Sequence, residues 1–454
     1  MGSKYRIDKD SLGDVKVPEE ALYGAQTQRA INNFKISGLR MPRRFIRSLG
    51  LIKAAAAKVN GELGLLDPRS ADAIHSAAME LASGKHFEHF PIDVFQTGSA
   101  TSTNMNVNEV IASLAGQQLK RIVHPNDEVN CSQSSNDVIP TAIHLSAQRG
   151  LEQQLLPSLI NLQQAILKKE RVLGDQLKTG RTHLMDAMPL SFAQELSGWR
   201  TQISLAINRI KDSQQRLCQI AQGGTAVGSG VNAPPDFAVL FAEQLSALSG
   251  SKFSTADNLF AAISSQDTAV ELSGQLKTLA VALLKIANDL RWMNSGPLAG
   301  LAEISLKPLQ PGSSIMPGKI NPVLPEAVAM AAVQVIGNDT TITLAGGSGN
   351  FQLNVMLPVI AYNLLLNIEL LTGSCQALMH AISDFTVNAE KLEESLARNP
   401  ILITALNKEI GYNKASEIAK RAYVEKRPIL DLAKEMTDLN AEYLTQLLDP
   451  KKLI

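Results

Sequence analysis

The sequence predicts a mainly α-helical protein built around a bundle of five long helices. Aromatic residues make up only 4% of the 454 residues, and this composition favours helix packing over a β-sandwich. Apolar residues also recur at alternating spacings of four and three, as they do along the seam of a bundled helix. One such seam contains Leu272, Leu276, Leu279, Leu283, Ile286 and Leu290. Another contains Leu155, Leu159, Leu162 and Ile166. The seams and the composition together indicate an all-α fold.

Breaks in the helical pattern divide the chain into three expected domains. Residues 1–133 mix helical patches, such as 47–63 and 70–83, with many prolines and glycines, and predict a smaller, mostly helical domain. Residues 134–386 hold the long helices, and residues 387–454 predict a small C-terminal helical domain. The long helices are expected over about 138–175, 191–221, 272–290, 324–344 and 354–383. Pro140 is expected to open the first of them, and Pro157 to kink it without ending it.

Charge and cysteine content exclude several classes of protein. The 43 basic side chains balance 43 acidic ones, so we expect neither nucleic acid nor a membrane as a partner. Residues 1–15 lack the apolar stretch of a secretory signal, and polar residues interrupt the most apolar segments farther along. Cys131, Cys218 and Cys375 are widely spaced, which suits a reducing compartment and disfavours a zinc site. We therefore expect a cytoplasmic protein without a metal site.

A loop at residues 312–322 combines two serines and a lysine with glycines and prolines. Glycines permit the backbone angles of a tight turn, in which free N–H groups converge as a nest for an anion. Ser313 would lie inside this nest, and Lys319 would add a full positive charge. Taken alone, the loop is equally compatible with a mobile surface turn.

Three more polar clusters fall at expected helix boundaries, at residues 97–106, 132–137 and 181–186. They supply hydroxyls, amides and one histidine but few carboxylates, which suits an anionic substrate. Helix capping explains the first of these clusters equally well. The site chemistry fits proton abstraction beside a carboxylate, where added negative charge needs stabilisation. The glycine-rich stretch 223–230 lacks the lysine of a P-loop, so we reject nucleotide binding there.

The 312–322 loop, Gly-Ser-Ser-Ile-Met-Pro-Gly-Lys-Ile-Asn-Pro, resembles the signature loop of the fumarase/aspartase superfamily. Further matching segments occur at 23–29, 104–109, 181–183, 223–228 and 411–412. Within the superfamily the chain most resembles the metal-free class II fumarate hydratases. The resemblance implies a three-domain helical fold, a homotetrameric helical core, no cofactor, and hydration of fumarate to (S)-malate.

The resemblance also implies a role for each matching residue. Ser313 would take the C3 proton of malate, and His183, oriented by Glu326, would handle the water at C2. The residues expected to bind substrate are Ser99, Thr101, Ser134, Ser135, Asn136, Thr182, Ser314, Lys319 and Asn321, with Ser314 also shaping the loop. His124, Asn126 and Asp127 resemble a second, non-catalytic dicarboxylate site, and a loop with a capping aspartate and a solvated histidine explains them equally well.

Two residues depart from the family pattern, and two other functions stay open. Ala100 replaces a usual glycine and is expected to tighten the carboxylate-binding segment or to exclude a positive φ, while Gln352 replaces a usual glutamate. Ammonia elimination from aspartate is the alternative reaction, although Ser135 and the pair Asn350 and Phe351 favour the hydratase. A catalytically silent scaffold is disfavoured because the proposed catalytic residues are all present.

Helix length predicts that one chain cannot hold a complete site. Asn136 lies just before the expected helix 138–175, and His183 lies just after it. Such a helix is about 55 Å long at 1.5 Å per residue, so both residues cannot reach one small substrate. We therefore expect subunits to share active sites within the tetramer.

Overall fold

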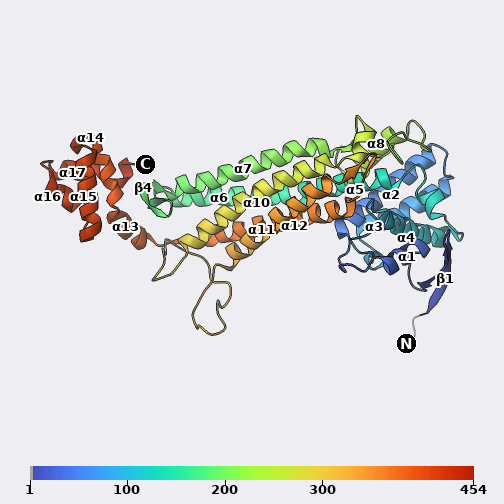
Figure 1. Cartoon of the computed structure of the whole chain (residues 1–454), viewed down its shortest axis with the longest axis horizontal. Coiled ribbons are helices and arrows are strands. Elements are labelled where there is room, and N and C mark those ends of the chain that lie inside the picture. Colours follow the sequence, from blue (N-terminus) through green and yellow to red (C-terminus); the bar gives the residue numbers. More distant parts are fainter. Residues whose placement is uncertain (1–3) are drawn as a thin grey trace. The chain divides into compact units, whose positions relative to one another are not determined.

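The computed structural model describes residues 4–454 and is mainly α-helical, as the sequence predicts. Its strands form small sheets of two strands each. The chain divides into two compact units, and Figure 1 shows the helices along the sequence. Of the described residues, unit 1 comprises 4–157, 207–280 and 332–372, and unit 2 comprises 158–206, 281–331 and 373–454. The expected division at 133 and 386 stays a prediction.

Unit 1 begins with an antiparallel hairpin of β1 (Tyr5–Asp10) and β2 (Gly13–Pro18). Its helices α2 and α3 confirm the patches predicted at 47–63 and 70–83. They pack closely because Gly50 of α2 has no side chain. A Cβ added at Gly50 would lie only 2.8 Å from the carbonyl oxygen of Ala78 in α3. The helices of this part are α1 (Ala25–Asn33), α2 (Arg43–Glu62), α3 (Pro68–Ser83), η1 (Phe87–His89), α4 (Thr101–Leu119), η2 (Pro125–Val129), α5 (Ser135–Gly150), α8 (Phe237–Ser249) and α9 (Leu259–Ser264). Its short strands are β5 (Gln219–Ile220), β6 (Ser254–Thr255), β8 (Gly349–Asn350) and β9 (Leu353–Asn354).

The first long helix is continuous from α5 through the π-helix η3 (Leu151–Leu155) into α6 (Leu156–Leu173). Pro140 does not open it, contrary to the prediction. The helix begins at Ser135 because Ser134 and Asp137 form a capping box there. Pro157 does not end the helix, as predicted. The wide π turn directly before it accommodates a residue that lacks an N–H and crowds the preceding turn.

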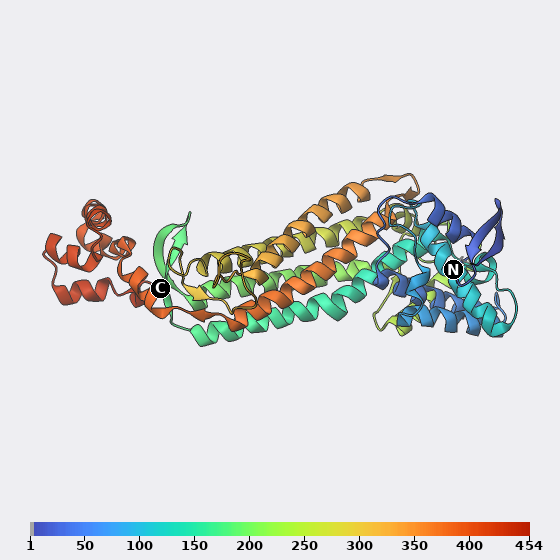
Figure 2. The ribbon, with the colours of Figure 1, turned by 90° about the horizontal axis from the view of Figure 1, so that it is seen from below.

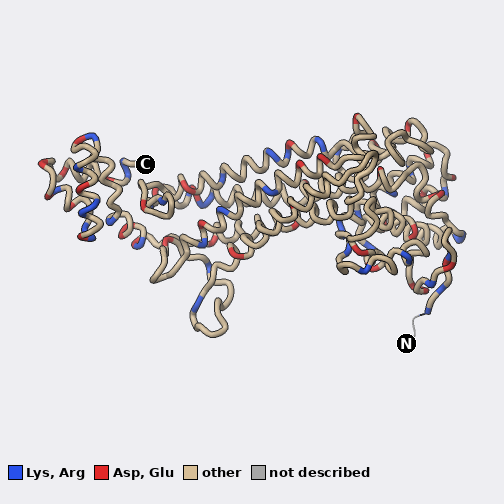
Figure 3. Tube along the Cα trace, viewed as in Figure 1, with Lys and Arg blue, Asp and Glu red and all other residues tan. Residues whose placement is uncertain are grey.

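The four other long helices are α7 (Phe192–Leu217), α10 (Asp267–Met293), α11 (Val323–Gly346) and α12 (Leu357–Asp384). Their bounds lie close to the predicted ranges. In unit 2, α6 and the adjoining parts of α7, α10 and α12 run side by side (Figures 1 and 2). Both predicted seams are confirmed, since all ten of their side chains are 0% exposed. Figure 3 shows charges of both signs interspersed along these helices.

Unit 2 also carries the C-terminal helices, which enclose a core of their own. Leu406, Ile418, Leu432 and Leu444 are fully buried in it. The elements are α13 (Ala389–Ala397), η4 (Pro400–Leu406), α14 (Asn407–Ile410), α15 (Tyr412–Glu425), α16 (Ile429–Met436), α17 (Ala441–Leu447) and η5 (Pro450–Lys452). The strands of this unit are β3 (Leu177–Thr182), β4 (Met185–Ser191), β7 (Ile304–Ser305) and β10 (Thr386–Val387).

Among residues 4–454, α12 alone is long and apolar enough to cross a membrane by length and composition. Its most apolar window is 56% buried inside the protein. One face contributes Leu364, Ile368 and Leu371 to the core, as expected for the core helix of a bundle.

Replacing Leu279 in the α10 seam by alanine should lower the free energy of unfolding by about 2–5 kcal/mol, because a cavity remains in the core. Urea unfolding at fixed protein concentration measures this loss. Thr278→Ala is the matched control, since Thr278 is exposed on the same helix and should change stability by less than about 0.5 kcal/mol. Equal losses in the two variants would contradict the assigned seam.

Candidate active site

The N-termini of α4 and α5 lie together in unit 1 and carry five of the predicted substrate-binding residues. Asn104 in the first turn of α4 donates to the hydroxyl oxygen of Ser135, the first residue of α5, at 3.0 Å. Ser99 and Thr101 are also paired, with 2.8 Å between their hydroxyl oxygens. Helix N-termini present free N–H groups and the positive end of the helix dipole. The arrangement therefore suits a carboxylate.

Ala100 corrects one expectation about this segment. Its methyl was expected to tighten the segment or to exclude a positive φ, but Ala100 adopts φ 55° and ψ 25° directly before α4. A residue with a Cβ strains in this region, and the surrounding packing holds it there, since Ala100 is fully buried. The neighbouring Gly98 has a different constraint, because an added Cβ would lie 2.0 Å from the carbonyl oxygen of Val355.

The glycine-rich turn at 223–230 holds the start of α5. Asp137 accepts a hydrogen bond from the backbone N–H of Gly223 at 3.1 Å and of Thr225 at 2.9 Å. Asn136 donates from its side chain to the carbonyl oxygen of Ala226 at 2.8 Å. Burial raises the pKa of Asp137 to about 7, although its backbone hydrogen bonds oppose the rise. The turn thus has a positioning role that the sequence did not reveal.

In the loop at 312–322 in unit 2, backbone N–H groups converge on the hydroxyl of Ser313. The Ser313 hydroxyl oxygen accepts hydrogen bonds from the backbone N–H of Ile315 at 3.2 Å and of Met316 at 3.0 Å. Two N–H donors aimed at one oxygen stabilise negative charge on it. Ser314, by contrast, is exposed.

Backbone pairing closes this loop. Gly312 N–H donates to the Lys319 carbonyl at 2.7 Å, and the Asn321 side chain donates to the Gly312 carbonyl at 2.7 Å. A Cβ at Gly312 would lie 2.6 Å from the Lys319 carbonyl oxygen, so only glycine fits there. Lys319, Asn321 and Glu326 then line an open pocket of about 800 Å³ together with residues at the end of α10.

Thr182 and His183 lie on the hairpin of β3 and β4, whereas the sequence predicted only a short connection between helices. His183 and Leu184 form its two-residue loop, with φ of 56° and 61°. Such turns normally contain asparagine or glycine, and this departure explains why the hairpin was missed. The loop leaves the imidazole of His183 exposed.

A buried ionic network anchors this hairpin. Glu303, which is 1% exposed, accepts from Arg181 through Oε1 at 2.7 Å. Its Oε2 lies 2.9 Å from the Lys178 Nζ in an ion pair without hydrogen-bond alignment. Lys178 also pairs with Glu195 at 2.7 Å. A register shift between Thr179 and Arg181 lets both cations of β3 reach Glu303, as bulges often re-aim side chains near active sites.

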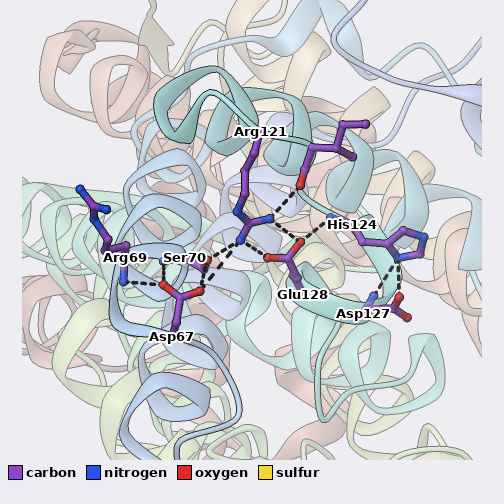
Figure 4. A network of polar contacts seen from close by, with 8 residues as sticks. Asp67, Arg69, Ser70, Arg121, His124, Asp127 and Glu128 are labelled. Carbon is purple, nitrogen blue, oxygen red and sulfur yellow. Dashed lines mark hydrogen bonds and ion pairs between the residues drawn. The ribbon is translucent and has the colours of Figure 1, made fainter.

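The predicted second dicarboxylate site is organised by local contacts (Figure 4). His124 Nδ1 accepts from the Asp127 N–H at 3.1 Å and lies 3.2 Å from its carboxylate. His124 thereby caps η2, while its backbone N–H donates to Glu128, which Arg121 also binds. Helix capping accounts for these contacts, although the capping side chain is His124 and not the expected aspartate. His124 and Asn126 also line an open pocket of about 730 Å³ with Arg6, so dicarboxylate binding stays a prediction.

The predicted site residues therefore form two groups. Unit 1 holds those of α4 and α5, and unit 2 holds Thr182 and His183 together with the 312–322 loop and Glu326. Among residues 4–454 no hydrogen bond joins His183 to Glu326 within one chain. The same part of the chain contains no cluster of three metal-binding side chains.

Comparison with known proteins identifies the family. Residues 13–337 match the family described as Lyase, and residues 402–454 match the family described as Fumarase C C-terminus. Fumarate hydratase class II 2 of Pseudomonas aeruginosa is 58% identical over 99% of this chain and 98% of its own length. The chain belongs to the class II fumarate hydratase family. Fumarate hydratase class II of Mycobacterium tuberculosis is 52% identical over 94% of this chain and 90% of its own length.

Solved structures agree with membership of the class II fumarate hydratase family. The class II fumarase of Schistosoma mansoni has a TM-score of 0.97 at 38% identity and covers 99% of both chains. A fumarate lyase:delta crystallin of Brucella melitensis, bound to cobalt, has a TM-score of 0.94 at 39% identity over 99% of both chains. The resemblance inferred from the loop and the all-α fold is thereby confirmed.

Several residues that position the site in this class II fumarate hydratase family member carried no predicted role. They are Asp137, Arg181 and Glu303. Arg181 and Asp137 adjoin predicted site residues in the sequence, which was a usable signal. Glu303 lies between short loops, and nothing in its sequence surroundings indicated its role.

Glu303→Gln should lower the free energy of unfolding by about 3–5 kcal/mol, because it leaves the buried Lys178 and the partly buried Arg181 without their shared carboxylate. Denaturant unfolding measures the loss. Asp384→Asn provides the control, since Asp384 makes an exposed ion pair with Lys307 at 3.4 Å and should change stability by less than about 1 kcal/mol. A similar small change for Glu303→Gln would show that the network does not anchor the hairpin.

Proposed function

We propose that this enzyme, a lyase, catalyses the reversible hydration of fumarate to (S)-malate. The observation that carries the proposal is the Ser313 hydroxyl held by two backbone N–H donors in the same loop as Lys319. The names of the relatives support this reaction, since the most similar of them are called fumarate hydratases. Those names favour it over ammonia elimination from aspartate, which was the alternative.

Ser313 acts as the base that removes the C3 proton of malate. The two N–H donors stabilise the Ser313 alkoxide before the step, and this oxygen becomes neutral when it accepts the C3 proton. Loss of the proton moves negative charge onto the adjacent carboxylate, where Lys319 and the remaining N–H of Asn321 stabilise it. No metal or cofactor is needed in this scheme.

His183 acts on the other side of the substrate, at C2. It donates a proton to the departing hydroxyl in the direction of dehydration and takes it back from water in hydration. Glu326 orients the imidazole, and Thr182 helps to hold the substrate. Ser99, Thr101, Ser134, Ser135 and Asn136 bind a carboxylate at the paired helix N-termini, with Ser314 and Lys319 assisting from the loop.

The active enzyme is a homotetramer with sites shared between subunits. Continuous helix from Ser135 to Leu173 supports this, because a helix of 39 residues is about 58 Å long, and Asn136 lies in its first turn while His183 follows its end in the sequence. Exposed apolar side chains give a second argument. Met330, Val333 and Leu344 are 69%, 61% and 70% exposed on α11, whose other side is also apolar and buried. A helix that is apolar all round is expected to be covered in the assembly.

Two finer expectations belong to the same proposal. The enzyme functions in the cytoplasm, where its three free cysteines would remain reduced. A dicarboxylate bound by His124, Asn126 and Asp127 would have to compete with the contact between His124 and Asp127.

Ser313→Ala should lower kcat by several orders of magnitude with little change in substrate binding, because the lost interaction belongs to the transition state. Absorbance of the conjugated double bond formed from malate measures the rate. Ser83→Ala is the control, since this exposed hydroxyl bonds only to the Glu80 carbonyl and lies outside the site. Retention of more than about a tenth of kcat/KM, a change below about 1.4 kcal/mol, would assign the base elsewhere.

His183→Asn and Ser313→Ala should each be almost inactive but should complement one another when unfolded and refolded together. If the two residues of a site come from different chains, random mixing leaves both intact in about a quarter of sites. Activity should therefore recover to about a quarter of the wild-type value. Each variant refolded alone is the control. Mixed tetramers that stay as inactive as their parents would show that one chain supplies both His183 and Ser313.

A further inference from the structure

Lys53 is a buried cation on α2, close to the proposed carboxylate-binding residues. Its side chain is 0% exposed, and its ammonium donates to Asn130 Oδ1 at 2.9 Å and Gln133 Oε1 at 3.1 Å. Both acceptors are neutral amides, and within residues 4–454 Lys53 makes no ion pair within 4.0 Å. A fully buried lysine without a paired carboxylate is uncommon and costly. Such a cost points to a role beyond packing.

Lys53 and Asn60 hold the turn that precedes α5. They lie two helical turns apart on the same face of α2. Asn60 donates to the Cys131 carbonyl at 2.9 Å and accepts from the Ser132 hydroxyl at 2.7 Å. Ser132 has a φ of 59°, so the turn has a conformation that an isolated serine rarely adopts. The next residue but one is the N-cap Ser134.

Asn130 connects Lys53 to the site itself. Its Oδ1 accepts from Lys53 and from the side-chain amides of Asn104 and Asn108, at 3.2 Å and 3.1 Å. Asn104 also donates to the Ser135 hydroxyl. The ammonium therefore reaches Ser135 through two amide side chains, in a buried network where charge acts strongly.

The electrostatic surroundings agree with a role in anion binding. Burial lowers the pKa of Lys53 to about 7, and the charge of Asp137 on α5 opposes this fall. Negative charge brought to the N-termini of α4 and α5 would favour the charged ammonium in the same way. The ammonium and a bound carboxylate would thus stabilise each other.

We propose that Lys53 is a positioning residue that orients Ser134 to Asn136 and supplies buried positive charge for binding the dicarboxylate substrate. This inference rests on the proposed function, because it requires that these residues bind a substrate carboxylate. Lys53 itself does not touch the substrate and takes no part in proton transfer.

The test compares Lys53→Met with Lys58→Met in the full-length assembled enzyme. Methionine approximates the length of lysine without its charge, and Lys58 is exposed on the same helix. We expect Lys53→Met to raise the KM for malate and the inhibition constant of succinate, a saturated dicarboxylate, by about tenfold, the equivalent of about 1.4 kcal/mol. The kcat should change by less than about twofold, and Lys58→Met should match the wild type.

Asn130→Asp is a second variant that tests the inference even if Lys53→Met does not fold. It retains an acceptor for Lys53 but pairs the ammonium with a carboxylate, and it should raise the same two constants. Normal constants in a folded Lys53→Met or Asn130→Asp enzyme would overturn the inference, as would a fall in kcat alone with a lower melting temperature. A wild-type enzyme that forms no fumarate from malate would instead refute the proposed function, whatever the variants bind.

Discussion

The apolar seams of the long helices constrain the rest of the structure. Side chains such as Leu162 and Leu283 are fully buried, so the close-packed core between these helices has no room for reactive groups. Chemistry is confined to the helix ends and to the connections between them. Ser135 lies at the start of α5, the His183 hairpin joins α6 to α7, and Ser313 lies between α10 and α11. The rigidity that stabilises the fold thereby also distributes the site along the chain.

Polar contacts around the proposed site residues show how these ends are made rigid. At the start of α5 a capping box, the glycine-rich turn and the amides around Asn130 meet within a few residues. The His183 hairpin depends instead on a buried carboxylate between two cations. In both places buried groups that touch no substrate determine where the exposed ones lie, a requirement for precise catalytic geometry.

Local patterns made the fold and the loop predictable from sequence. The seams define long helices by spacing alone, and Gly312 and Gly318 mark a turn that few other residues could form. The His183 hairpin was unpredictable because its loop uses two residues that normally avoid positive φ. The expectation that Ala100 excludes a positive φ was wrong because its burial overrides the preference of alanine for negative φ. Lys53 lies in an otherwise apolar, alanine-rich run from 52 to 57. A charged residue in such a run indicates a buried cation, but the spacing of apolar residues does not reveal it.

The π-helix at Leu151–Leu155 gives one turn of the first long helix an extra residue. A π turn contains one residue more than an α-helical turn, whereas each residue of a regular α-helix turns the chain by about 100°. Deleting one residue here would therefore restore regular α-helix and leave Leu159 and Leu162 facing the core. The same deletion in a regular turn would rotate everything after it by about 100° and carry apolar side chains out of the core. This stretch should therefore accept a single-residue deletion more readily than the regular turns of the same helix.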